Sequence, residues 1–153
     1  MATEEQFSPS RKQVHDLVAY LDALTGSVDT LFTWRGGDRG PNGVIEMPWV
    51  EYSKPVMSFV QDAYRLGFVI DFNWPDWQET AFGLQQSAAA MRRANLVDLA
   101  KLLTVHLRKD RFVTGHLASA LQNGWIQDIL WSMREIAENS DGAAGDSFAG
   151  GAP

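Results

Sequence analysis

The feature that most constrains this chain is the spacing of its apolar residues, which recur at intervals of three and four in five separate segments. In a helix, this spacing places the apolar side chains on one face, which must be buried against another element. The segments cover residues 11–25, 53–66, 95–107, 110–123 and 125–138. We therefore expect about five amphipathic helices.

Capping residues support the boundaries of these helices. Ser10 and Gln13 have the spacing of a capping box, and Gly26 follows the last apolar position of the first segment. Ser53 is the expected cap of the second helix, which has Pro55 in its first turn. Further candidate caps and stops are Gly67, Asp76 for a helical turn through Phe82, Asn95, Asp110 or Thr114, and Gly124.

Residues 28–52 have a different pattern, in which apolar residues flank the glycine-rich stretch 35–43. This pattern predicts two short strands around a wide turn, and Pro48 confines the second strand to an edge. Residues 68–72 predict a third strand, because a lone hairpin is only marginally stable. We disfavour nucleotide binding at the glycine-rich stretch, which lacks the phosphate-binding patterns. The expected fold class is α+β, mainly α, with about five helices packed on an antiparallel sheet of two or three strands.

The length of 153 residues suits one globular domain. We expect this domain to span residues 8–138, because residues 139–153 lose both periodicity and bulk. That last stretch predicts a disordered tail, in which only Phe148 could dock against another surface. The expected core comprises Leu17, Leu21, Leu24, Trp34, Phe59, Val60, Leu99, Leu103, Phe112, Leu117, Ile129, Leu130 and Met133.

Composition excludes several functional classes. The chain has no cysteine, which removes disulfides, thiolate nucleophiles and cysteine-based metal sites. Its three histidines lack metal-binding spacing, so we expect no metal and no cofactor. The net charge of −6 opposes nonspecific binding to nucleic acid or anionic membranes. No apolar stretch of about 20 residues predicts a membrane span, and we expect a cytoplasmic protein with no membrane contact.

The acidic chain nevertheless contains a basic stretch at residues 92–111, with six basic and two acidic residues. On the expected helix, Lys101 and Arg108 point away from the apolar face, so we expect this stretch to be at least partly exposed. Its two interpretations are a solvated helix face and a patch that binds a phosphate or an acidic protein surface. Trp131 lies among polar residues of the last helix, where it is either covered by the same chain or offered to a partner.

Residues 108–116 place two arginines, a carboxylate and an imidazole at a helix junction. Arg108, Arg111 and His116 could bind an anion there, together with Trp34 and Tyr52. In the structural alternative, Arg111 pairs with an acid and His116 bonds to a backbone carbonyl. We expect His106 to be a partly buried, hydrogen-bonded histidine rather than a ligand.

The helices expected at 96–107 and 114–122 are joined by a short connection, as in a helix-turn-helix. The second of them carries no basic residue, whereas helices that read the major groove present arginine, lysine or asparagine to base edges. We therefore disfavour sequence-specific DNA binding.

Several motifs resemble an uncharacterised bacterial family that is known only as a domain of unknown function. They lie at residues 33–37, 47–48 with 52–53, 102–104 and 108–117, and the last has the form R-x-D-R-F-x-x-G-H-L. The resemblance covers about residues 17 to 137 and implies bacterial origin and a single domain. It carries no activity, cofactor or partner. Because such families often occur on phages and mobile elements, it also implies an anti-defence or regulatory binder.

Two functional classes remain after these exclusions. The first is a small acidic, non-enzymatic protein that acts by protein–protein interaction, with Lys101, Arg108 and Trp131 at the interface. The second is a small-anion or nucleotide-binding protein, or an enzyme, that uses Trp34, Tyr52, Arg108, Arg111 and His116, with His116 as an acid–base. We favour the first class, because no catalytic residue spacing is present.

Overall fold

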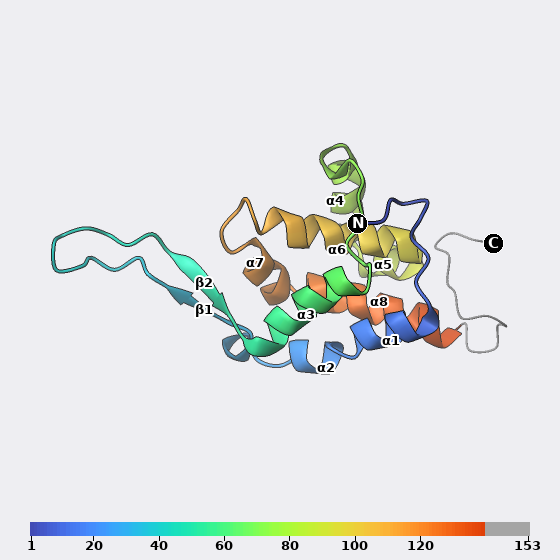
Figure 1. Cartoon of the computed structure of the whole chain (residues 1–153), viewed down its shortest axis with the longest axis horizontal. Helices are drawn as coiled ribbons and strands as arrows, with labels where there is room; N and C mark the ends of the chain where they lie inside the picture. Colours follow the sequence, from blue (N-terminus) through green and yellow to red (C-terminus); the bar gives the residue numbers. More distant parts are fainter. Residues whose placement is uncertain (140–153) are drawn as a thin grey trace.

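The computed structural model describes residues 1–139 and has an α+β fold that is mainly helical, as predicted. Figure 1 shows a body of packed helices from which a β-hairpin extends at one end. The helices are α1 (Arg11–Val18), α2 (Leu21–Leu24), α3 (Lys54–Arg65), α4 (Gln78–Gln86), α5 (Ala88–Arg93), α6 (Leu96–Lys109), α7 (His116–Gln122) and α8 (Trp125–Asn139), and the strands are β1 (Phe32–Arg35) and β2 (Trp49–Tyr52).

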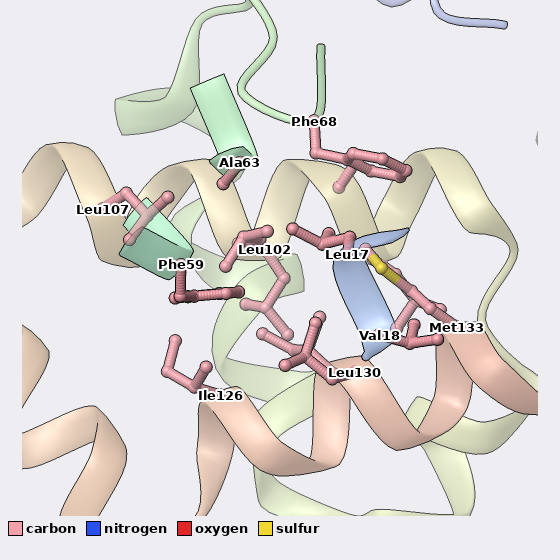
Figure 2. Close-up of a cluster of buried hydrophobic side chains, with 14 of the residues drawn as sticks. Leu17, Val18, Phe59, Ala63, Phe68, Leu102, Leu107, Ile126, Leu130 and Met133 are labelled. Atoms are coloured by element: carbon pink, nitrogen blue, oxygen red, sulfur yellow. The ribbon is translucent and has the colours of Figure 1, made fainter. Parts of the chain in front are cut away.

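The hydrophobic core lies around α8, which packs against α1, α2, α5, α6 and α7. Figure 2 shows part of this core, where Phe59 of α3 and Leu102 of α6 lie close to Leu130 of α8. The side chains of these three residues are fully buried. Ten of the predicted core residues are buried, namely Leu17, Leu21, Leu24, Phe59, Leu99, Leu103, Leu117, Ile129, Leu130 and Met133, and Val60 packs partly buried against them.

Two predictions of core residues are wrong. Trp34 is 51% exposed and Phe112 is 75% exposed. Trp34 lies on β1, and Phe112 follows α6 in the connection to α7. Neither side chain enters the helical core, because the hairpin contacts the body only at its root and residues 111–114 of the connection are exposed.

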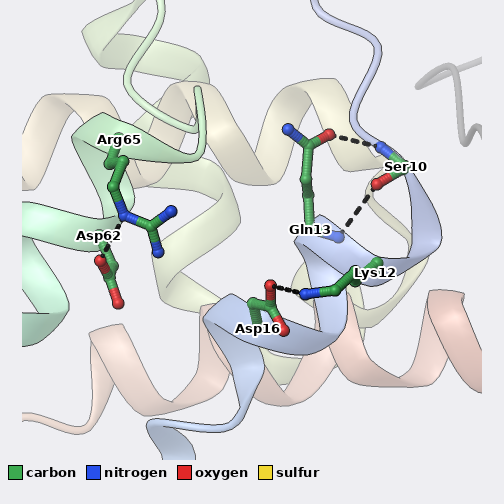
Figure 3. Close-up of polar contacts among 6 residues, drawn as sticks. All are labelled: Ser10, Lys12, Gln13, Asp16, Asp62 and Arg65. Atoms are coloured by element: carbon green, nitrogen blue, oxygen red, sulfur yellow. Dashed lines mark hydrogen bonds and ion pairs between the residues drawn. The ribbon is translucent and has the colours of Figure 1, made fainter.

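The first predicted helix is interrupted. The capping box at its start is confirmed, since the Ser10 hydroxyl accepts from the Gln13 amide and the Gln13 side chain accepts from the Ser10 amide (Figure 3). However, α1 ends at Val18 and a separate turn, α2, ends at Leu24, before Gly26. Tyr20 lies at the break, where its hydroxyl donates a hydrogen bond to Asp62 of α3. This tertiary contact holds the chain at the point where the helix changes course.

Two ion pairs on the surface of the body join residues about one helical turn apart. Lys12 and Asp16 form an ion pair one turn apart on α1, and Asp62 and Arg65 form another on α3 (Figure 3). The hydrogen bonds from Tyr20 and Arg65 lower the pKa of Asp62, with the Tyr20 bond as the larger cause. The Asp62 carboxylate therefore links α3 to the break between α1 and α2.

Residues 68–72 do not form the predicted third strand of the sheet. Phe68, Val69 and Ile70 are buried, but they lie against α6 and the N-terminal residues rather than beside the hairpin. The Ile70 amide donates to the Thr104 hydroxyl at 3.1 Å, and the Asp71 amide donates to the Ala2 carbonyl at 2.7 Å. The backbone groups that we expected to pair with a strand are satisfied by α6 and the start of the chain.

The sheet therefore has only two strands, paired antiparallel with Phe32 opposite Tyr52 and Arg35 opposite Trp49. The helices do not pack on it as a layer. The hairpin, residues 32–52, extends away from the body instead (Figure 1), and we call it the arm. Its loop is closed by backbone hydrogen bonds such as Gly37 N–H to Glu46 O at 2.7 Å. Gly36 is required there, because a Cβ would lie 2.6 Å from the Met47 carbonyl oxygen.

Other boundaries differ from expectation in detail. The turn expected through Phe82 is a longer helix, α4, which Asp76 does not cap. The short helix α5 had no counterpart in the sequence analysis. Ser53 occupies the N-cap position of α3 without a capping hydrogen bond. Of the predicted tail, Asn139 belongs to α8, and residues 140–153 with Phe148 lie outside the described part of the chain.

Within residues 1–139, no helix combines the length and the apolar character that crossing a membrane requires.

Candidate functional site

The root of the arm is joined to the body by a compact hydrogen-bond network. The Tyr52 hydroxyl, at the end of β2, donates to Asp110 Oδ1 at 2.9 Å and accepts from the Ala118 amide at 3.1 Å. The same Asp110 oxygen accepts from the Leu117 amide at 2.8 Å. Asp110, one of the two predicted caps of this helix, thus accepts from the first turn of α7, while Gly115 occupies the N-cap position.

Tyr52 serves this network as a neutral phenol. Burial and, second, the hydrogen bond to Asp110 raise the pKa of its hydroxyl above the usual value of 10.0. A phenol with a raised pKa stays protonated near neutral pH, so its hydroxyl donates a hydrogen bond to the carboxylate. Tyr52 and Asp110 therefore fix the arm and α7 relative to each other.

A second contact at the arm root is between Trp34 and Gly115. A Cβ at position 115 would lie 2.5 Å from the Trp34 ring, so the ring rests directly on the glycine backbone. Gly115 also has a φ of +81°, a conformation that glycine adopts without strain. The inner face of the arm is thus seated on the connection between α6 and α7, although Trp34 keeps half of its surface exposed.

A groove of about 460 Å³ opens beside this junction, between α3 and the α6–α7 connection. Met57, Val60 and Tyr64 of α3 form one apolar wall, and Leu107 and Leu117 are on the opposite side. Tyr52, Gln61, Asp110 and Arg111 complete the lining. Such a cavity, with apolar walls and a few polar groups at its edge, is typical of binding sites.

Arg111 is the cation of this groove. Its side chain is exposed and makes no ion pair or hydrogen bond with any of the residues 1–139. This finding removes the structural alternative in which Arg111 pairs with an acid of the hairpin or of α3. The guanidinium remains available to an anionic group outside this chain.

His106 and His116 form a pair on a different side of α6. Their Nδ1 and Nε2 atoms are 3.0 Å apart, and the His106 ring also stacks on Trp125 with 5.6 Å between centroids. Burial, followed by the charge of His116, lowers the pKa of His106 to about 3. Burial also lowers the pKa of His116. His106 is fully buried, more than the sequence predicted, and His116 contacts His106 rather than a backbone carbonyl.

The five residues predicted to line one pocket are not brought together. Tyr52 and Arg111 share the groove, whereas His116 lines a separate cavity of about 140 Å³ with His106, Phe82 and Lys109. Arg108 extends toward the N-terminus, where its Nη1 lies 3.9 Å from Met1 Sδ. Trp34 lies on Gly115, as described above.

The expectation that Lys101 is exposed is wrong, since the residue is only 8% exposed. Its ammonium pairs with Glu4 at 3.2 Å and lies over the rings of Phe72 and Trp77, at 4.9 and 4.7 Å from their centroids. The helix face opposite the apolar stripe is covered by the N-terminal residues and by residues 72–77, which the periodicity of α6 does not reveal.

Trp131 is half-buried and packs against the core, and the Arg92 guanidinium lies 4.4 Å from the centre of its ring. Of the two interpretations of this tryptophan, intramolecular cover agrees with these contacts.

The structure adds exposed residues of the arm that the sequence analysis did not propose for a site. Val44, Ile45 and Met47 are 68%, 58% and 81% exposed, and Trp49 is 46% exposed. The sequence indicates this exposure, because the facing segment of the hairpin, residues 38–40, is Asp-Arg-Gly. Apolar residues opposite such a segment have no apolar neighbour across the strand pair.

No curated protein and no solved structure matches this chain. A model of a family of unknown function, DUF6508, matches residues 9–139, which include the arm, the groove and both histidines of the pair. The match agrees with the resemblance to an uncharacterised family, and the chain belongs to the DUF6508 family of unknown function.

Proposed function

We propose that this chain is a small, acidic, non-enzymatic binding protein that acts by protein–protein contact, and that the arm is its contact surface. The observation that carries the proposal is the exposure of Val44, Ile45, Met47 and Trp49 on a hairpin that no helix covers. The proposal includes the bacterial or mobile-element origin that the family resemblance implies, with a regulatory or anti-defence role.

Physical reasons support an interaction role for the arm. A two-stranded hairpin alone is marginally stable in water, because it has no third strand or helix against which to bury an apolar face. Its open edges also offer backbone groups to another chain. Exposed apolar side chains gathered on such an element are typical of interaction sites. The arm is nevertheless held at its root by Tyr52 and Trp34, so it is presented in a defined direction. This preorganisation reduces the entropy lost on binding.

The polar groups near the arm support a non-enzymatic role. Asp110 holds two donors, Tyr52 is kept neutral, and His106 is buried and neutral. Each of these groups has a structural partner that accounts for its position. A general acid or base requires instead a pKa near the working pH and access to a substrate.

A pull-down from a bacterial lysate tests the proposal. The bait is the full chain, compared with the double variant Ile45→Asp/Met47→Asp, in which two exposed apolar residues of the arm become charged. The control is Phe82→Asp, which makes the same change at an exposed residue of α4. We expect the wild type and the control to retain the same stoichiometric protein, and the arm variant to lose it. Equal retention by all three chains would contradict the proposal.

A second candidate function is the binding of a small anion in the groove, and Arg111 favours it because its guanidinium has no partner among residues 1–139. Native mass spectrometry of the purified wild type and of Arg111→Ala tests this candidate. An anionic molecule bound to the wild type and absent from the variant would support it. Identical spectra without a bound molecule would exclude it.

A further inference from the structure

We infer that the chain has a separate binding site, a cavity between α2, α5 and α8 that takes a small zwitterionic molecule of the size of a free amino acid. The cavity has a volume of about 300 Å³, which is at the lower end of the range for small-molecule sites. It shares no lining residue with the groove, and no residue of the arm lines it. The site is therefore independent of the arm and of its proposed function.

Four charged side chains from three helices line this cavity. Asp22 lies on α2, Arg92 on α5, and Asp128 and Arg134 on α8. None of the four charged groups forms an ion pair or a hydrogen bond with any residue in the range 1–139. Charges of both signs that line one cavity without pairing keep their hydrogen-bonding capacity for a third molecule.

The two arginines supply the donors of this site. The Arg92 guanidinium lies over the ring of Trp131, 4.4 Å from the ring centre, and this contact holds it in place without using an acceptor for its N–H groups. Arg134 follows Trp131 by about one turn of α8 and lines the same cavity. Guanidinium groups bind a carboxylate through two parallel hydrogen bonds. The cavity thus has cations for the carboxylate of a ligand.

Asp128 supplies an acceptor that lacks a donor in the described part of the chain. Burial raises the pKa of its carboxyl, and the charge of Arg92 offsets this effect only in part. A carboxylate that loses water without gaining a donor is destabilised, and an ammonium group bound beside it would supply that donor. Asp22 gives a second acceptor from α2, which packs against α8.

The balance of charges determines the class of ligand. Two carboxylates oppose a simple anion such as phosphate, and two guanidiniums oppose a simple cation. A molecule that carries one carboxylate and one ammonium group complements both pairs at once. Leu21 and Met91, which are buried, and Ala88 give the cavity an apolar part as well. An amino acid with an apolar side chain, such as leucine, therefore has the matching chemistry.

The walls of the cavity are fixed to one another. The Gln127 side-chain amide donates to the Leu24 carbonyl oxygen at 2.8 Å and to the Leu121 carbonyl oxygen at 3.1 Å. The first of these bonds joins α8 to the end of α2, and both helices contribute lining residues. A cavity that hydrogen bonds hold in shape before a ligand enters loses less entropy on binding.

Isothermal titration calorimetry of the full chain tests the inference by changing the ligand. The three probes share one side chain: L-leucine, N-acetyl-L-leucine, which lacks the ammonium group, and L-leucinamide, which lacks the carboxylate. We expect leucine to bind about tenfold or more tightly than either analogue, because each analogue leaves two charges of the cavity without a partner. The absence of leucine binding up to its solubility limit, or equal affinity for the three probes, would overturn the inference. Binding of inorganic phosphate in place of leucine would also overturn it.

Conservative variants test the two halves of the site separately. Asp128→Asn should lower the preference for leucine over N-acetyl-leucine several-fold and leave the preference over leucinamide unchanged. Arg134→Gln should show the reverse. The controls Glu138→Gln on α8 and Arg93→Gln on α5 remove exposed charges outside the cavity, and they should bind leucine as the wild type does. If all four variants keep the wild-type preferences, with circular dichroism spectra that show an intact fold, leucine does not bind in this cavity and the inference is wrong.

Discussion

The ring of Trp34 lies on the backbone of Gly115, and a Cβ at that position would come within 2.5 Å of the ring. This contact joins the arm to the connection between α6 and α7, next to the hydrogen bonds of Tyr52 with Asp110 and Ala118. Two contacts therefore determine the direction in which the arm leaves the body: the Trp34 ring on the Gly115 backbone and the hydrogen bonds of the half-buried Tyr52 hydroxyl. The predictions below test these contacts first.

Gly115→Ala should destabilise the protein more than Gly124→Ala. Both glycines have a positive φ, +81° and +78°, so alanine at either position introduces backbone strain of about 1–2 kcal/mol. Only at position 115 does the new methyl group also meet Trp34, since the space around Gly124 is open. Urea denaturation measures the difference. In a Trp34→Ala background, Gly115→Ala should lose only as much free energy of unfolding as Gly124→Ala. A larger loss in that background would show that the Trp34 ring is not its cause.

Tyr52→Phe should lower the free energy of unfolding by about 1–2 kcal/mol, because the Ala118 amide loses its acceptor and Asp110 loses a donor. Tyr64→Phe removes a hydroxyl from an exposed tyrosine and should change it by less than about 0.5 kcal/mol. Chemical denaturation of both variants at pH 7 measures these effects, and equal effects would refute the role of the Tyr52 network.

The same phenol predicts a dependence on alkaline pH. Folding raises the pKa of Tyr52 above its unfolded value of 10.0, so its contribution to stability is complete below pH 10 and is lost as the pH rises further. We expect the wild type to lose stability above pH 10 more steeply than Tyr52→Phe. Parallel curves for the two chains would contradict the raised pKa.

The buried histidine pair predicts acid sensitivity. The pKa of His106 is about 3 in the folded chain and 6.5 in the unfolded chain, so the unfolded state binds the additional proton between these values. Stability should therefore be complete above pH 6.5 and fall as the pH decreases toward 3, and His116 contributes in the same direction. His106→Phe should flatten this dependence in denaturation curves between pH 7 and pH 4. His15→Gln, at an exposed histidine of α1, is the matched control variant.

Lys101→Met should destabilise the chain by about 1 kcal/mol through the loss of the ion pair with Glu4 and of the contacts with the rings of Phe72 and Trp77. Lys12→Met provides the control, because the Lys12–Asp16 pair is exposed and such pairs contribute about 0–0.5 kcal/mol. Thermal unfolding compares the two variants. An equal change in both would mean that burial adds nothing at Lys101.

Features that depend on neighbouring residues could be predicted from the sequence. The Ser10–Gln13 capping box and the apolar stripes of α3, α6 and α8 are local, and each was found where expected. The break after α1 could not be predicted, because it coincides with a hydrogen bond between Tyr20 and Asp62, 42 positions apart. For the same reason residues 68–72 were assigned to the sheet, although their backbone is satisfied by Thr104 and Ala2.

The site was less accessible from the sequence than the fold. Asp110 was identified as a helix cap, but its second donor, Tyr52, is 58 positions away. Lys101 was expected on a solvated face because the periodicity of α6 contains no information about the N-terminal residues that cover it. Trp34 is in the expected core but keeps half of its surface exposed. Its strand lies in the arm, whose sheet has no layer packed on it.

Capture of a partner through the arm tests the central claim most directly. A pull-down from a bacterial lysate compares the wild type with Ile45→Asp/Met47→Asp and with Phe82→Asp, after circular dichroism has shown that the three chains are equally folded. We expect the wild type and Phe82→Asp to retain the same stoichiometric protein and the arm variant to lose it. A protein that all three chains retain equally, or no retained protein with any of them, would contradict the assignment of the arm as the contact surface.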